Sequence, residues 1–215
     1  HSDPGYDLTY SDVFMVPSLS DVPSRMSVDL RTPDGIGTTI PIVVSNMTAV
    51  AGRRMAETVA RRGGIAILPQ DIPVDVVAKV IDYVKRCHTM FETPITLAPD
   101  ATIADALSLI HKRAHGAVVV VDNGTPVGVF TESDGDGFDR FTQLANVMSS
   151  SLHILSPDID PAAAFDHLGR NRLRVAPVVD DDGHLLGVIT REGALRSTIY
   201  DPAVDAQGRL MVGAA

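Results

Sequence analysis

The sequence predicts an α/β protein in which strand–helix units are interrupted by an internally repeated α+β segment. Between residues 40 and 86, short apolar runs rich in β-branched residues alternate with stretches of helical periodicity. From about residue 93 onward, a pattern that begins at Leu97 returns at Leu155, an offset of 58 residues (155 − 97). Alternation followed by repetition indicates an interrupted parallel sheet and a duplicated unit.

The first segment has the pattern strand, helix, strand, helix. Residues 41–47 (PIVVSNM) and 65–69 (IAILP) are predicted strands of the type that is buried on both faces. Residues 52–64 (GRRMAETVARRGG) predict a helix that Gly63 ends, and residues 73–86 (PVDVVAKVIDYVKR) predict a second helix. The two strands should be parallel neighbours joined by a right-handed crossover. Two such units cannot cover a sheet or close a barrel, so they indicate the opening of a larger fold.

The repeated segment is predicted to contain two units of strand, helix, strand, turn and strand, each followed by a short helix. LAPDATIADALSLI matches LSPDIDPAAAFDHL, and AVVVVD matches VAPVVD. The turns fall at Asn123-Gly124 and at Asp181-Asp182-Gly183, whose residue types accept the positive φ of hairpin turns. The second turn is one residue longer, so the offset becomes 59 in the strands that follow.

Each predicted hairpin ends in a related motif. GVFTESD carries Thr131 and Asp134, whereas GVITREG keeps Thr190 and has Gly193 in place of the aspartate. A motif of this form, repeated at a fixed offset within matched units, resembles the signature of tandem CBS domains, which together are called a Bateman module. The resemblance covers roughly residues 93–200.

The resemblance implies that this motif binds a nucleotide. In such modules adenine or guanine nucleotides lie in clefts between the two repeats, so ATP or GTP is the expected regulatory ligand. Thr131 would donate its hydroxyl to a phosphate, and Asp134 would accept the ribose 2′ and 3′ hydroxyls. Gly193 cannot hold a diol, which predicts one complete cleft and one degenerate or empty cleft. The alternative is that the Thr–Asp pair is a helix N-cap with no ligand.

Basic residues follow the predicted first helix of each repeat. They form HKRAHG (residues 111–116) and GRNRLR (residues 169–174), and the second cluster contains Arg172 and Arg174. Together with Thr190, these arginines are candidate ligands for the phosphates of a regulatory nucleotide. The alternative is that cations near helix C-termini only complement the helix dipole.

The segments that flank the repeats resemble IMP dehydrogenases and GMP reductases. DLTYSDVFMVPSLSDV (residues 7–22) is similar to the start of those enzymes, and residues 38–68 match the first two strand–helix units of their (β/α)8 TIM barrel. GRLMVGAA (residues 208–215) resembles the third barrel strand. The resemblance implies four parts, which are the N-terminal portion of the barrel (1–90), two CBS repeats (91–147 and 148–201) and the return to the barrel (202–215).

The resemblance also implies hydride transfer at C2 of a purine nucleotide, with NAD(P) as cofactor. Active sites of such barrels lie at the C-terminal ends of the strands. Ser45, Asn46 and Met47 would therefore contact the purine nucleotide, and the alternative for Met47 is ordinary core packing. The catalytic cysteine of the family lies on a loop beyond this chain, and Cys87, after the second predicted helix, is not a substitute. No catalytic residue is expected in these 215 residues, which should be inactive alone.

Departures from the common pattern bear on the direction of the reaction. Thr48 stands where IMP dehydrogenases have an aspartate, and Pro69–Asp71 (PQD) replaces their basic stretch. The Asn46-Met47 pair with nearby Gly52 resembles the corresponding stretch of GMP reductases. These residues slightly favour GMP reduction over IMP oxidation. Both reaction directions stay open on the sequence alone. The alternative function is a free-standing CBS-pair nucleotide sensor, which does not explain the strand–helix units before the repeat.

Composition narrows the partners and the compartment. The net charge of −9 argues against nucleic acid or an anionic membrane surface as a partner. No apolar run approaches the roughly 18 residues of a membrane span, and a single cysteine fits a reducing cytoplasm. No metal site is expected. The resemblance implies a homo-tetramer, and CBS pairs often join such tetramers into octamers.

Overall fold

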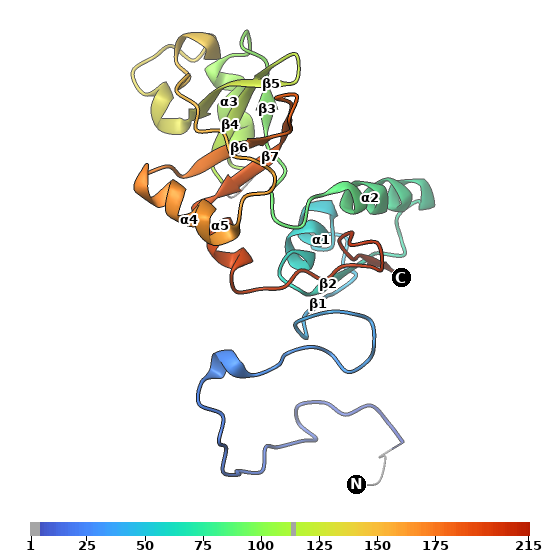
Figure 1. The fold of residues 1–215 in the computed structure, drawn as a ribbon. Helices are drawn as coiled ribbons and strands as arrows, with labels where there is room; N and C mark the ends of the chain where they lie inside the picture. The colour runs from blue at the N-terminus through green and yellow to red at the C-terminus, as the bar shows by residue number, and fades with distance from the viewer. Residues whose placement is uncertain (1–4, 113–114) are drawn as a thin grey trace. The chain divides into compact units, whose positions relative to one another are not determined.

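The computed structural model describes residues 5–112 and 115–215, which separate into two units at Leu30 (Figure 1). In the first unit, residues 5–30, the regular element is a short 3-10 helix, η1 (Arg25–Ser27). Ser24 caps it by accepting a hydrogen bond from the Met26 amide at 3.2 Å. The second unit, Arg31–Ala215, contains all the other helices and strands described below.

A parallel sheet of three strands runs in the order β1 (Val43–Val44), β2 (Ile65–Leu68), β8 (Gly213–Ala214). The helices α1 (Arg53–Ala60) and α2 (Val74–Arg86) alternate with these strands. The predicted parallel pairing of the first two strands is confirmed, and the predicted third strand joins them on the other side of β2.

The prediction that residues 41–47 form a strand buried on both faces was wrong. Only Val43 and Val44 are strand, and Val43 is 64% exposed. The reason is position, since β1 lies at the edge of the sheet while β2 lies in the middle and is largely buried. The predicted stop of the first helix is confirmed, because α1 ends at Ala60 and Gly63 follows with φ +92°.

The first repeat consists of β3 (Thr96–Leu97), α3 (Ile103–Ile110), β4 (Ala117–Asp122), β5 (Thr125–Thr131) and the 3-10 helix η2 (Glu132–Gly135). A further 3-10 helix, η3 (Leu144–Asn146), follows. The predicted turn at Asn123-Gly124 is confirmed by φ values of 49° and 88° at these two residues, as a type I′ hairpin requires.

The second repeat consists of α4 (Pro161–Arg170), β6 (Val175–Val179), β7 (Leu185–Thr190) and α5 (Arg191–Ser197). Its predicted opening strand is reduced to a single bridge between Leu155 and Val178. α4 begins in the predicted region because the Asp160 carboxylate accepts hydrogen bonds from the Ala162 and Ala163 amides.

The two repeats share an apolar contact between β4 and the hairpin of the second repeat. Ala117 and Val119 from β4 form one buried cluster with Val175 and Val188. Each repeat also has its own core, and Phe91, at the start of the predicted first repeat, lies in the core of the second. Among the described residues, no helix is both long and apolar enough to span a bilayer.

Candidate functional site

The first copy of the repeated motif forms a hydrogen-bonded unit at the end of β5. One oxygen of Asp134 accepts from the Thr131 amide at 2.7 Å and from the Thr131 hydroxyl at 2.8 Å. This is the capping geometry that the sequence offered as an alternative to nucleotide binding. The other carboxylate oxygen makes no hydrogen bond to another described residue, so the cap leaves an acceptor available to a ligand.

The second copy obtains a carboxylate from a different part of the chain. The buried Thr190 hydroxyl donates to Glu92 Oε1 at 3.0 Å and accepts from the Gly193 amide at 2.8 Å. A Cβ at Gly193 would lie 3.0 Å from Glu92 Oε1 and 2.8 Å from the Thr190 hydroxyl. The glutamate therefore lies beside the position where the aspartate is missing.

Three predicted residues, Thr190, Arg172 and Arg174, are brought together in the wall of one cavity of about 660 Å³. Thr131 and Asp134 do not line this cavity. A volume of this size lies within the range of small-molecule sites. Its wall also contains residues from outside the predicted set, which include Glu92, His115, Phe165, Arg191, Glu192 and Arg196.

The cavity wall contains more cationic side chains than the neighbouring carboxylates neutralise. Arg196 forms an ion pair with Glu192 at 2.8 Å, and the Arg191 guanidinium lies 4.6 Å from the centre of the Phe165 ring. The guanidinium groups of Arg172 and Arg174, by contrast, make no hydrogen bond or ion pair with any other described residue. The wall is therefore suited to a multiply charged anion such as a polyphosphate.

The positions of Arg172 and Arg174, and the backbone conformation of Arg172, argue against a role that only complements the helix dipole. α4 ends at Arg170, and Arg172 and Arg174 lie beyond its Asn171 C-cap, whereas dipole effects fall off within the last turn. Arg172 has φ +55°, a left-handed conformation that is uncommon for a residue with a Cβ and often occurs at ligand sites. In the equivalent HKRAHG cluster, residues 113–114 lie outside the described part of the chain, and His115 lines the cavity.

Ser45, Asn46 and Met47 lie directly after β1, at the carboxyl edge of the parallel sheet. All three are exposed, and Met47 is 58% exposed, so the alternative of core packing for Met47 does not apply within this chain. Nearby at the same edge, the Thr48 hydroxyl donates to the carboxylate of Asp71 at 3.3 Å. The geometry matches the edge where barrel active sites lie, and the surface here is open.

Cys87 lies in a buried polar cluster beneath α1 and not at this edge. Its thiol donates to Glu57, and burial together with the nearby Glu57 charge raises the pKa of Cys87. Glu57 is fully buried and also accepts from the Thr93 hydroxyl at 2.8 Å and the Tyr83 hydroxyl at 3.3 Å. A raised pKa reduces the thiolate fraction, which opposes a nucleophilic role.

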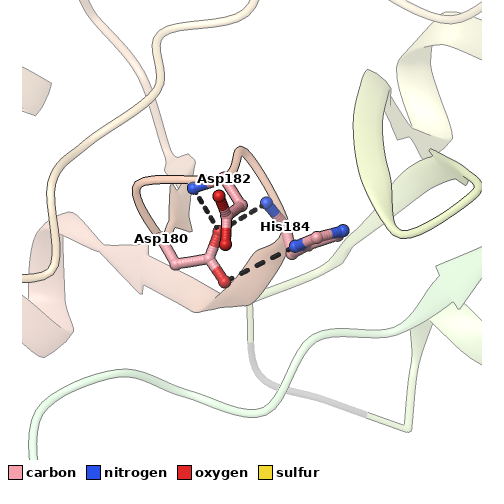
Figure 2. Close-up of side chains that lie close together, drawn as sticks. All are labelled: Asp180, Asp182 and His184. Atoms are coloured by element: carbon pink, nitrogen blue, oxygen red, sulfur yellow. Dashed lines mark hydrogen bonds and ion pairs between the residues drawn. The ribbon is translucent and has the colours of Figure 1, made fainter.

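Asp180, Asp182 and His184 gather at the tip of the second hairpin (Figure 2). Asp180 Oδ1 accepts from the Asp182 amide at 3.1 Å and the His184 amide at 2.8 Å, and the other oxygen lies 3.6 Å from the imidazole. These contacts close the longer of the two turns.

Comparison with known proteins identifies the family. The IMP dehydrogenase / GMP reductase domain matches residues 7–215. The chain belongs to this family. Relatives named GMP reductase in Mycobacterium tuberculosis and Mycobacterium bovis are 54% identical over 212 residues, which are 99% of this chain and 44% of theirs. An inosine-5′-monophosphate dehydrogenase of Nitrosopumilus maritimus is 36% identical over 213 residues, covering 97% of this chain and 45% of that protein.

Solved structures support the same relationship to the IMP dehydrogenase / GMP reductase family. A Trypanosoma brucei GMP reductase in complex with guanosine 5′-triphosphate has a TM-score of 0.66 at 28% identity, over 96% of this chain and 52% of that one. The C318A form of that enzyme with guanosine 5′-monophosphate gives 0.67 at 28% identity, over 96% and 46%. The chain thus spans about half the length of the relatives it matches.

Sequence reasoning found Thr190, the two arginines and the HKRAHG cluster that contains His115, but it missed Glu92 as a residue of the same cavity. No signal in the motif indicates Glu92, because it lies 98 residues before Thr190 in the sequence. The pairing of residue 92 with β7 brings it there, and that pairing is a property of the tertiary fold.

Proposed function

We propose that this chain is the N-terminal and regulatory portion of a GMP reductase. The observation that carries this proposal is the 54% identity to proteins named GMP reductase over nearly the whole chain, against 36% for those named IMP dehydrogenase. In the proposed reaction a hydride from NAD(P)H replaces the 2-amino group of GMP, which takes up a proton and leaves as ammonia, so that IMP and NAD(P)⁺ are formed. IMP oxidation is the second candidate, favoured by the relatives that carry that name.

Residues 1–90 and 202–215 are proposed to supply the first two strand–helix units and the third strand of the barrel. Ser45, Asn46 and Met47 would contact the purine nucleotide, because they follow a strand at the carboxyl edge of the parallel sheet. These three residues are exposed, and we assign the residues that hold NAD(P) to the remainder of the full-length protein. Cys87 is half-buried, follows α2 and has a raised pKa, so the 215 residues alone should not catalyse.

Residues 91–147 and 148–201 are proposed to be a pair of CBS domains that binds ATP or GTP as a regulatory ligand. Support comes from the duplicated fold, the two Thr-centred motifs and the arginine-lined cavity. A homo-tetramer, with octamers formed through the CBS pairs, is the assembly that this proposal implies. The alternative, a sensor with no catalytic activity, would share the nucleotide site and lack the reaction.

The reaction is tested in the full natural protein by nicotinamide absorbance, with GMP plus NAD(P)H in one assay and IMP plus NAD(P)⁺ in the other. GMP-dependent oxidation of NAD(P)H is expected, and the 215-residue chain should be inactive as a matched control. Faster turnover of IMP would replace the proposal by IMP oxidation. Turnover of neither substrate, with nucleotide binding retained, would favour the sensor.

The regulatory site is tested by calorimetric titration of ATP and of GTP into the chain and its Asp134→Ala variant. Removing a charged hydrogen-bond acceptor should weaken binding by roughly 10- to 150-fold at the first cleft. Asp136→Ala, an exposed acid two residues away, is the matched control and should bind as the parent does. If the parent binds neither nucleotide, the repeats are scaffold and regulation must be sought elsewhere.

A further inference from the structure

The residue that pairs with the second strand of each hairpin comes from outside the signature motif. Glu92 pairs with Val188 of β7 through hydrogen bonds of 2.8 and 3.0 Å. In the first repeat, Ser149 pairs in the same way with Val129 of β5, at 3.0 and 2.9 Å. Val129 and Val188 are the matching residues of GVFT and GVIT, so Ser149 and Glu92 occupy equivalent positions.

The acidic residue occupies a different position in each repeat. The first repeat has its acid at Asp134 in the motif and a serine at 149, whereas the second has its acid at Glu92 and a glycine at 193. In both repeats one carboxylate oxygen accepts the hydroxyl of the motif threonine, at 2.8 Å in the first and 3.0 Å in the second. Each repeat therefore has one carboxylate in contact with its threonine.

Gly193 is what allows Glu92 to occupy this place. A Cβ at residue 193 would come within 3.0 Å of Glu92 Oε1, and an aspartate there would add a second negative charge beside the first. Glycine at 193 leaves room for the Glu92 carboxylate, whereas an aspartate there would crowd it. It does not by itself make the second cleft degenerate.

We propose that Glu92 is the ribose-binding carboxylate of the second cleft, and that this cleft binds a purine ribonucleoside triphosphate. This inference rests on the proposed regulatory function and extends it to a second site. Glu92 and Thr190 lie in the wall of the 660 Å³ cavity together with Arg172 and Arg174. The carboxylate accepts the two hydroxyls of the ribose, and the arginines that lack ion-pair partners among the described residues bind the phosphates.

The position of Glu92 also connects the cleft to the first helix of the parallel-sheet segment. The next residue, Thr93, donates its hydroxyl to the buried Glu57 of α1 at 2.8 Å. A ligand bound to Glu92 therefore contacts the residue next to Thr93, and the Thr93 side chain is hydrogen-bonded to α1. One backbone step and one hydrogen bond therefore separate Glu92 of the second cleft from α1.

The experiment is calorimetric titration of ATP, and separately of 2′-deoxy-ATP, into the chain and its Glu92→Ala and Glu92→Gln variants. Both variants should lose one binding site or weaken it by roughly 10- to 150-fold. The parent should prefer the ribonucleotide, and the variants should lose that preference at this site. GTP and 2′-deoxy-GTP are run in parallel to establish which purine the site accepts.

Glu192→Ala is the matched control, because Glu192 lines the same cavity and pairs with Arg196. Removing either glutamate makes the cavity more positive, so electrostatics alone predicts tighter phosphate binding for both variants. Only a role in holding the ribose predicts weaker binding for Glu92→Ala and not for Glu192→Ala. Glu92→Gln retains the shape and the backbone pairing with Val188, which keeps the test valid if Glu92→Ala fails to fold.

A double variant, Glu92→Ser with Gly193→Asp, copies the arrangement of the first repeat into the second. It should recover binding that Glu92→Ser alone loses, which a purely structural role of Glu92 would not produce. Unchanged stoichiometry and affinity in Glu92→Ala and Glu92→Gln would overturn the inference. If those variants bind normally while Asp134→Ala does not, the regulatory function stands and the second site does not. If the parent does not bind, both fail.

Discussion

The two repeats reach the same local arrangement by different routes. In the first, Thr131 and its carboxylate partner Asp134 are three residues apart, and the contact forms within one turn. In the second, Thr190 takes its partner, Glu92, from a segment 98 residues away. The comparison teaches that a threonine whose motif lacks the acid can take a carboxylate partner from a distant segment, which a search along the chain does not reveal.

The largest expected difference between the repeats lies in the side chain that covers each hairpin glycine. Phe91 is 1% exposed in the core of the second repeat, while Met148 is a partly buried side chain in the first. Phe91→Ala should lower the free energy of unfolding by about 3–5 kcal/mol, and Met148→Ala by about 2 kcal/mol or less. Urea unfolding followed by circular dichroism measures both, and equal losses would contradict the comparison.

A smaller effect is expected from adding a methyl group to those glycines. At Gly187 a Cβ would lie 2.8 Å from the Phe91 Cβ and 3.2 Å from the Glu92 carbonyl oxygen, which cannot move away easily. At Gly128 the obstructing atoms belong to the flexible Met148 side chain. Gly187→Ala should cost about 1–3 kcal/mol of stability, and Gly128→Ala less. Urea unfolding measures both variants, and a lower midpoint for Gly128→Ala than for Gly187→Ala would contradict the prediction.

Removing each threonine hydroxyl tests the two capping arrangements. Thr190→Ala should cost about 1–2 kcal/mol, because it removes the N-cap of α5 and the donor to Glu92. Thr131→Ala should cost about 0.5–1 kcal/mol, since the Thr131 amide still donates to Asp134. Thr→Ser at each site retains the hydroxyl and serves as the control in thermal unfolding. A larger loss at Thr131 would reverse this assignment.

The smallest expected difference is in acid sensitivity. α3 of the first repeat begins with a capping box in which hydrogen bonds from the Thr102 hydroxyl and amide hold the pKa of Asp105 below its ordinary value. A lowered folded-state pKa contributes stability above the unfolded pKa of about 3.9 that is lost as pH falls through the folded value. Asp105→Asn should therefore flatten the fall in stability below about pH 4.

Unfolding midpoints measured between about pH 5 and pH 2 check this prediction, with Asp100→Asn as a nearby control in the first repeat. The control acid is exposed, precedes α3 and lies outside the capping box. Parallel curves for the parent and Asp105→Asn would contradict the assignment.

Local pattern was sufficient for elements whose partners are close in sequence. The turn at Asn123-Gly124 was predicted because only a few residue types accept two successive positive φ values, and both values are positive in the structure. The duplication was predicted because both copies keep the same apolar spacing. The burial of β1 was predicted wrongly, because periodicity reports what a strand can bury and not whether it lies at the centre or the edge of its sheet.

The sequence by itself determined the alternation of strands and helices, the two repeated units, the family resemblance and the identity of Thr131, Asp134, Thr190 and the two arginines as candidate residues. Only the tertiary structure decided that Glu92 contacts Thr190 and that Arg172 and Arg174 share a cavity with both. The physical reason is that spacing along the chain specifies hydrogen bonds within a turn or a helix. Contacts between distant segments depend on which strands pair and which side chains a shared core excludes from water.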